Sequence, residues 1–248
     1  MPITDTARLP SRLARWLGAA RGETVTLLAL LAVAAAVLVF VELAEEVMEG
    51  ETAAFDRAVL LALRTAADAT DPVGPPWFEQ AVQEVTALGS IPVLGLMTLG
   101  VLGYLLILRK RATALLVLVS VGGGTALSSA LKLLFARSRP DLVPHAVETA
   151  TASFPSGHAM LSAVTYLTLG ALLARVEEGR HARGYVLGVG IVLTLLVGFS
   201  RVYLGVHWPT DVLAGWSVGA AWAVLCTAVA LRLQRRGAIE RPGEPAEG

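Results

Sequence analysis

Six long stretches of the chain are free of charged side chains. A helix needs about 20 mostly apolar residues to cross a bilayer, because a charge near the bilayer centre is costly. The pattern therefore predicts six membrane-spanning helices, at residues 24–41, 85–108, 112–131, 157–174, 184–200 and 212–231. We expect an all-α, polytopic membrane protein in which residues 1–236 form a single six-helix domain. Residues 237–248, rich in Pro, Gly and Glu, are expected to form a flexible cytoplasmic tail.

Basic residues are distributed unevenly between the predicted loops, which indicates the orientation of the chain. Short loops on the cytoplasmic side of a membrane carry an excess of Lys and Arg. Fourteen of the twenty basic residues lie in four places that a six-span chain puts on the same side of the membrane. These places are the segment before the first span, the loop between the second and third spans, the loop between the fourth and fifth spans, and the segment after the sixth span. The residues are Arg8, Arg12, Arg15, Arg21, Arg109, Lys110, Arg111, Arg175, Arg180, Arg183, Arg232, Arg235, Arg236 and Arg241. Residues 42–84 instead carry ten acids against Arg57 and Arg64. We therefore expect both termini in the cytoplasm and residues 42–84 outside.

The outer segment contains a shorter apolar pattern. Phe55, Val59, Leu60 and Leu63 recur at helical spacing, which predicts a short amphipathic helix against the bilayer or the bundle. The Pro- and Gly-rich residues 71–76 then break this helix. The first outer loop is thus expected to have structure of its own.

Composition agrees with a membrane protein and narrows its partners. Charged residues make up 16% of the chain, against about a quarter in soluble domains. The net charge is zero, so no overall positive field attracts nucleic acid, and the expected partner is the lipid bilayer. Cys226, the single cysteine, has no intrachain disulfide partner. Close helix approach is expected at the three glycines 122–124 and at Gly215 and Gly219.

Four basic residues fall outside both the cytoplasmic set and the acidic segment. Lys132, Arg137, Arg139 and Arg201 lie at or near the predicted outer ends of the third and fifth spans. Snorkelling to the membrane surface would explain one such residue. Four of them beside polar motifs indicate an anion site.

Lys132 and Arg139 have the spacing of two helical turns, so they are expected to share a helical face until Pro140 ends the run. The planar guanidinium of Arg139 binds two phosphate oxygens, whereas Lys132 supplies a compact charge. Together they suit a tetrahedral phosphate, with Arg137 as a possible further contact.

The segment from Phe154 to His158, Phe-Pro-Ser-Gly-His, immediately precedes an apolar helix. Backbone N–H groups at a helix start, the Ser156 hydroxyl and the absence of a side chain at Gly157 predict a preformed anion cradle. A lone membrane histidine is more often a buried hydrogen-bonding residue. Beside this cradle and the basic cluster, His158 is better interpreted as a proton-transfer group.

A third motif, Ser200-Arg201-x5-His207-x3-Asp211, joins the last two spans. His207 and Asp211 have i,i+4 spacing, which predicts that they are neighbours on one helical face. A carboxylate bonded to one ring nitrogen fixes the tautomer and raises the basicity of the other, as an imidazole nucleophile requires. A salt bridge that caps the helix is the alternative interpretation.

With these motifs in order, the sequence resembles the type 2 phosphatidic acid phosphatase superfamily of membrane lipid phosphatases. The resemblance rests on Lys132-x6-Arg139-Pro140, on the Pro-Ser-Gly-His segment and on the His207 motif. Residues 86–90, Thr-Ala-Leu-Gly-Ser, also resemble bacterial members. One departure is Ser138, where many relatives have proline, and it affects only the local backbone.

The resemblance implies a role for each matching residue. His207 attacks phosphorus to form a phosphohistidine, Asp211 orients His207, and His158 protonates the leaving oxygen and then activates water. The residues expected to hold the phosphoryl oxygens are Lys132, Arg139, Ser156, Gly157 and Arg201. The scheme uses no metal and no other cofactor, and only Asp141, Glu148 and Asp211 supply carboxylates near the motifs.

Two other classes of protein share parts of this pattern. A membrane transporter also carries intramembrane charges, but here the charges gather at one face instead of crossing the bilayer. Vanadium haloperoxidases share a related phosphate-like pocket, but they resemble larger soluble proteins.

The motifs are expected to bind only the phosphate of the substrate, so they do not identify its lipid part. Undecaprenyl diphosphate is the leading candidate, with Arg137 as a contact for the second phosphate. Phosphatidylglycerol phosphate and phosphatidic acid are close alternatives, and phosphotransfer to an acceptor other than water is a further one. No feature of the sequence selects an oligomeric state.

Overall fold

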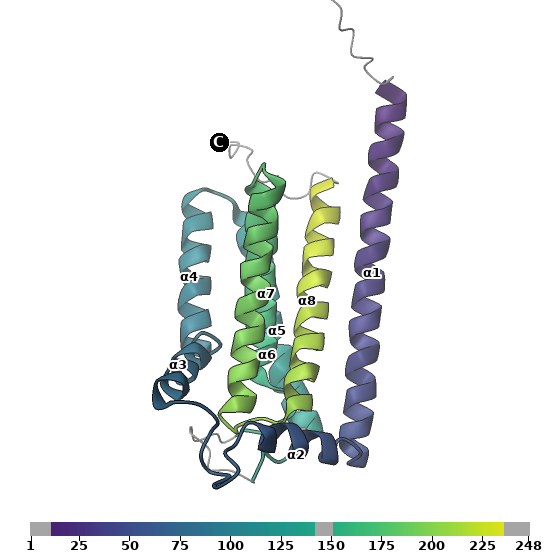
Figure 1. The fold of residues 1–248 in the computed structure, drawn as a ribbon. Helices are drawn as coiled ribbons and strands as arrows, with labels where there is room; N and C mark the ends of the chain where they lie inside the picture. The colour runs from purple at the N-terminus through teal and green to yellow at the C-terminus, as the bar shows by residue number, and fades with distance from the viewer. Residues whose placement is uncertain (1–10, 142–150, 236–248) are drawn as a thin grey trace, which may run out of the picture.

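The computed structural model describes residues 11–141 and 151–235, and this part of the chain is an α-helical bundle (Figure 1). The described helices are α1 (Ser11–Glu49), α2 (Ala53–Ala62), α3 (Pro76–Ala87), α4 (Ile91–Ile107), α5 (Arg111–Phe135), α6 (Gly157–Val176), α7 (Arg180–Tyr203) and α8 (Pro209–Arg235). The predicted all-α membrane fold is confirmed. The expected tail at 237–248 lies outside the described residues, and the domain boundary at 236 stays a prediction.

Five of these helices, α1, α5, α6, α7 and α8, are long and apolar enough to cross a membrane. A sixth candidate span is the bent pair of α3 and α4, which meet at 48° across a three-residue break. The prediction of one continuous helix over 85–108 is therefore wrong. Ser90 caps α4 by accepting a hydrogen bond from the Val93 backbone, and Pro92 follows in the first turn of α4.

The bundle is built around α6, which packs against α5, α7 and α8. The predicted close approach of α8 is confirmed, since a Cβ on Gly219 would lie 2.6 Å from the Met160 carbonyl oxygen of α6. In the most apolar stretch of α6, 61% of the residues are buried, whereas none of the residues in the corresponding stretch of α1 is buried. Helix α1 stands at the side of the bundle, against α8 (Figure 1).

The predicted amphipathic helix is α2, which runs across one end of the bundle (Figure 1). Leu60 is fully buried in a cluster with Ala159 of α6 and Val212 of α8, while Phe55 is 51% exposed. Helix α2 therefore packs on the bundle itself and covers the starts of two spanning helices.

Candidate active site

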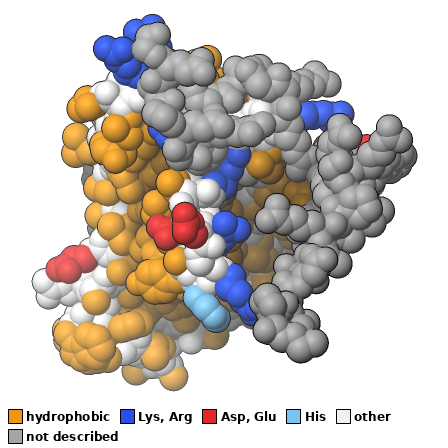
Figure 2. Space-filling model, turned by 90° about the horizontal axis from the view of Figure 1, so that it is seen from above, with side chains coloured by type: hydrophobic (Ala, Val, Ile, Leu, Met, Phe, Trp, Pro, Cys, Tyr) orange, Lys and Arg blue, Asp and Glu red, His pale blue; other side chains and the backbone are white. Residues whose placement is uncertain are grey.

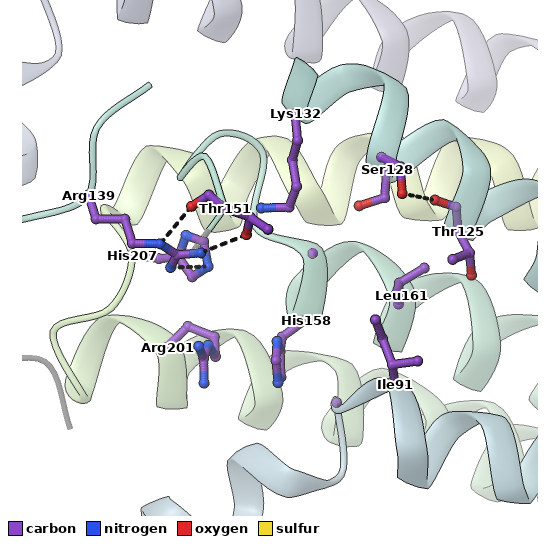
Figure 3. Close-up of a pocket in the computed structure, with 13 residues that line it drawn as sticks. Ile91, Thr125, Ser128, Lys132, Arg139, Thr151, His158, Leu161, Arg201 and His207 are labelled. Carbon is purple, nitrogen blue, oxygen red and sulfur yellow. Dashed lines mark hydrogen bonds between the residues drawn. The ribbon is translucent and has the colours of Figure 1, made fainter. Parts of the chain in front are cut away.

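The three polar motifs meet at the end of the bundle that α2 crosses, where they line a cavity of about 230 Å³ (Figure 3). Lys132, Arg139 and His207 lie on one side of the cavity, and His158 and Arg201 face them. The other lining residues are Gly89, Ile91, Thr125, Ser128, Ser129, Thr151, Gly157 and Leu161. Three cations and two histidines that are far apart in the sequence thus share one cavity.

Lys132 and Arg139 converge by a different route from the one expected. Helix α5 ends at Phe135, and Ala136 adopts a left-handed conformation with φ of 42°, so Arg139 does not continue the helical face. The turn at Ala136 sends the chain back toward the cavity. Lys132 Nζ donates to the Ala152 carbonyl at 2.6 Å, and Arg139 donates to the Thr151 carbonyl at 3.0 Å. Both cations therefore brace the segment that leads into the next motif.

The start of α6 contributes Gly157 and His158 to the cavity. A Cβ on Gly157 would lie 3.3 Å from Lys132 Cε, so the small residue lets the lysine pass close to the helix start. Ser156 is the N-cap residue, but its hydroxyl is buried, makes no capping hydrogen bond and is not among the lining residues. Its backbone N–H donates instead to the Asp211 carbonyl at 2.9 Å. In this structure Ser156 ties α6 to α8.

His207 is 2% exposed and is held through both ring nitrogens. Its Nδ1 lies 3.4 Å from Asp211 Oδ2 and 3.3 Å from Ser153 Oγ, while its Nε2 lies 3.2 Å from an Arg139 guanidinium nitrogen. Arg139 only donates, so these contacts place the proton on Nδ1 and the lone pair on Nε2. Burial lowers the pKa of His207 to about 4, although Asp211 acts in the opposite direction. The ring is therefore neutral at neutral pH, with Nε2 available as a nucleophile.

Asp211 combines the two roles that the sequence offered as alternatives. His207 precedes α8, so the pair does not share a helical face as expected. The fully buried Asp211 carboxylate reaches back to the Trp208 backbone N–H at 2.9 Å, as in a capping box, and also contacts His207 Nδ1. It accepts a further hydrogen bond from Ser153 Oγ. The cap thus fixes the carboxylate that orients the histidine.

Arg137 is the residue whose expected role differs most from its observed place. It does not line the cavity, and its guanidinium lies between Asp56 Oδ2 at 2.8 Å and Asp211 Oδ1 at 2.6 Å. The predicted contact with a substrate phosphate is absent from this geometry, because two carboxylates already occupy the guanidinium. Arg137 therefore lies behind Asp211, outside the lining of the cavity.

Arg201 is 2% exposed and faces the cavity from the last turn of α7. It donates to Thr86 Oγ1 at 2.9 Å, and its Nε has no hydrogen-bond partner among the described residues. The segment 86–90 is thereby linked to the site. A Cβ on Gly89 would lie only 2.3 Å from Val197 of α7, so glycine permits the close approach of the α3–α4 break.

Sequence analysis missed several residues that support the site. Ser153, Thr151 and Asp56 hold His207, Arg139 and Arg137, respectively. The burial of Asp56 was predictable from the sequence, because an acid four residues before Leu60 lies on the buried face of the amphipathic helix. In the described part of the chain, no group of three or more His, Cys, Asp or Glu side chains is placed to hold a metal ion.

The arrangement suits transfer of a tetrahedral anion. Lys132, Arg139 and Arg201 supply positive charge around the space in front of His207 Nε2. His158 provides a second imidazole on the opposite side for proton transfer.

Comparisons with known proteins agree with this geometry. The model of the PAP2 superfamily matches residues 113–235, which include all three motifs. Phosphatidylglycerophosphatase B of Bacillus subtilis is 35% identical over 150 residues, covering 58% of this chain and 71% of that protein. Undecaprenyl-diphosphatase of Sulfolobus acidocaldarius is 43% identical over 68 residues, covering 27% of this chain and 29% of that protein.

The fold has a counterpart among solved structures as well. The crystal structure of a transmembrane PAP2-type phosphatidylglycerolphosphate phosphatase from Bacillus subtilis matches with a TM-score of 0.74 at 29% identity, covering 82% of this chain and 98% of that one. Sequence, fold and motif geometry agree, and the resemblance noted from the sequence is confirmed. The chain belongs to the PAP2 superfamily and is a membrane phosphatase that hydrolyses phosphate esters.

Proposed function

We propose that this phosphatase removes a phosphate from a membrane lipid at the outer face of the bilayer, through a phosphohistidine on His207. The observation that carries the proposal is the meeting of two histidines and three cations around one cavity at an end of a membrane-spanning bundle. A lipid phosphate reaches such a cavity with its tail still in the bilayer, and each buried methylene contributes about 0.8 kcal/mol to that anchoring.

In the first step, His207 Nε2 attacks phosphorus while the bond to the lipid oxygen breaks and its electron pair stays on that oxygen. His158, as an imidazolium, gives the oxygen its proton. The bound phosphate supplies the negative charge that favours the imidazolium form. Arg139 exchanges its contact with Nε2 for a phosphoryl oxygen, and Lys132 and Arg201 bind the others.

In the second step, water attacks the phosphohistidine. His158, now neutral, takes a proton from this water, and the electron pair of the P–N bond returns to Nε2. Inorganic phosphate leaves, and both histidines regain their starting forms. Asp211 stays ionised throughout and stabilises the positive charge on His207 between the steps.

The outer location rests on the charges at the two ends of the bundle. The end opposite α2 carries Lys and Arg side chains, seen in blue in Figure 2. It includes Arg109 and Lys110 between α4 and α5, and Arg111 at the start of α5. The positive-inside rule assigns this end, and with it both termini, to the cytoplasm. In a Cys226→Ala background, Ala67→Cys should react with an impermeant thiol reagent in intact cells, whereas His181→Cys should not. The opposite labelling would reverse the orientation.

The observed cavity changes the order of the candidate substrates. Undecaprenyl diphosphate depended on Arg137 for its second phosphate, and Arg137 is engaged by Asp56 and Asp211. The cavity wall on α5 instead presents hydroxyl groups, from Thr125, Ser128 and Ser129. Such groups suit the one free hydroxyl of a glycerol headgroup that carries a terminal phosphate. Phosphatidylglycerol phosphate is therefore the first candidate, in line with the Bacillus subtilis relative, and undecaprenyl diphosphate, in line with the Sulfolobus acidocaldarius relative, is the second.

Initial rates in mixed micelles decide between them. Phosphatidylglycerol phosphate, undecaprenyl diphosphate and phosphatidic acid are compared at equal surface fractions, with Ser128→Ala beside the wild type. We expect the first lipid to react fastest and to lose the most rate in the variant. A rate for undecaprenyl diphosphate tenfold above the rate for phosphatidylglycerol phosphate would make undecaprenyl diphosphate the first candidate. Such a ratio corresponds to about 1.4 kcal/mol in the barrier. Failure to release phosphate from any of the three would overturn the proposed function.

A further inference from the structure

Asp56 is an acidic residue on the buried face of α2, far from the three motifs in the sequence. It is 1% exposed, and its carboxylate accepts hydrogen bonds from Arg137 at 2.8 Å, from the Thr210 hydroxyl at 2.7 Å and from the Thr210 backbone N–H at 3.0 Å. These partners lie in the segment after α5 and at the start of α8. A helix of the first outer loop is therefore fastened to the start of the helix that carries Asp211.

Packing alone does not call for a carboxylate at this position. Taking a charge out of water is costly, and apolar residues of similar volume often stabilise a buried site as well as an ion pair does. Leu60, four residues later on the same face, already docks α2 through its side chain. The carboxylate of Asp56 thus needs an explanation beyond docking.

The contacts of Arg137 lead from Asp56 to the nucleophile. Arg137 donates from one terminal guanidinium nitrogen to Asp56 and from the other terminal nitrogen to Asp211 Oδ1, at 2.6 Å. The other oxygen of Asp211 faces His207 Nδ1 at 3.4 Å. The four side chains form one continuous series of polar contacts that ends at the ring expected to attack phosphorus.

The charges of these four side chains indicate what the series of polar contacts does. Arg137 and Asp211 alone would form a neutral pair, which stabilises a cationic histidine poorly. With Asp56 the three groups carry a net charge of −1 beside His207, whose ring becomes positive as Nε2 bonds to phosphorus. The cations Lys132, Arg139 and Arg201 lie on the cavity side and act in the opposite sense.

We propose that Asp56 is a positioning residue of the phosphatase, which acts through Arg137 to hold and charge-balance the Asp211–His207 pair. The inference rests on the proposed function of His207. It adds to the three motifs a residue contributed by the amphipathic helix of the outer loop, and it makes the docking of α2 part of the catalytic machinery.

The test measures kcat and KM of the full-length protein in micelles, with the lipid phosphate that the wild type hydrolyses fastest. Asp56→Asn keeps the shape but removes the charge, and we expect kcat to fall about tenfold while KM stays within about twofold. Asp56→Glu keeps the charge but disturbs the packing, and it should retain more kcat than the Asn variant. Asp68→Asn is the matched control, because this exposed carboxylate of the same outer segment accepts its hydrogen bonds from Thr70.

A double variant keeps the test decisive if Asp56→Asn does not fold. Asp56→Asn with Arg137→Gln removes both partners and leaves no unpaired charge between them. Its kcat should equal that of Arg137→Gln alone, because Asp56 acts through Arg137. A double variant at least fivefold slower than Arg137→Gln, or an Asn variant that keeps more kcat than the Glu variant, would overturn the inference. A wild type that hydrolyses no lipid phosphate would instead overturn the proposed function.

Discussion

The two ends of the bundle carry similar side chains in opposite physical states. At the α2 end, Arg201, His207 and Asp211 are at most 2% exposed and are held by hydrogen bonds. At the other end, Arg180, His181 and Arg183 are exposed to solvent or lipid headgroups. The number of charges along the chain therefore indicates orientation, whereas burial and pairing of a charged side chain indicate a role in chemistry. Matched substitutions at the two ends test this difference.

The largest difference in turnover between substitutions at the two ends is expected for the histidines. His207→Ala removes the proposed nucleophile, so turnover should fall at least about 10³-fold and no phosphohistidine should form. His181→Ala, at the exposed end, should leave both unchanged. Trapping of labelled phosphate after an acid-free quench measures the intermediate. Full labelling of His207→Ala would show that another residue is the nucleophile.

The loss of kcat on removal of a carboxylate should be smaller than the loss in His207→Ala. Asp211→Asn keeps the volume and one hydrogen bond but loses the charge that stabilises a cationic His207, so kcat should drop by about 10²-fold or more. The exposed Glu178→Gln serves as the control and should retain the wild-type rate. Unchanged turnover in Asp211→Asn would reduce Asp211 to a helix cap.

A comparable test applies to the arginines. Arg201→Gln removes a buried cation from the cavity that is proposed to hold the phosphate, and kcat/KM should fall by about 10²-fold, as for the loss of one group that stabilises transition-state charge. Arg180→Gln should have no effect on kcat/KM. Initial rates over a range of lipid surface fractions measure both, and equal values for the two variants would contradict the proposed role of Arg201.

Packing near the two ends should differ as well. A Cβ on Gly215 would lie 2.7 Å from the Ser156 carbonyl oxygen, so Gly215→Ala should separate α8 from α6 and destabilise the protein by about 1–3 kcal/mol. Gly184 has no atom within 4 Å of such a Cβ, and Gly184→Ala should be neutral or slightly stabilising. Thermal unfolding in detergent compares the two. Equal unfolding midpoints would show that α6 and α8 are not packed as described.

The smallest expected effect is that of chelation. The proposed chemistry uses cationic side chains and histidines, so EDTA should leave the rate within about twofold of the untreated enzyme. Vanadate should inhibit competitively, because it mimics the five-coordinate transition state. A rate lost with EDTA and restored by one equivalent of a divalent cation would replace this mechanism with a metal-assisted one.

The membrane fold and most of the cavity are predictable from the amino-acid sequence. Uncharged stretches of about 20 residues leave little alternative to spanning helices, because lipid cannot satisfy charges or open backbone groups. Lys132, Arg139, His158, Arg201 and His207 were all identified from short motifs, and all of them line the cavity. Local patterns carry this information because each motif sits at the end of a helix whose position the bilayer fixes.

The contacts that support these residues depend on the tertiary structure. The break at Ser90, the turn at Ala136 and the place of Ser156 depend on neighbouring helices, and a hydropathy pattern contains none of these contacts. Arg137 shows this most clearly, since a basic residue that lies in sequence between two cavity-lining cations, Lys132 and Arg139, looks the same whether it faces a substrate or a carboxylate. Its partner Asp56 comes from another helix, more than 80 residues earlier. Only the folded chain brings the two together, because a buried charge takes its role from the groups that pair with it in space.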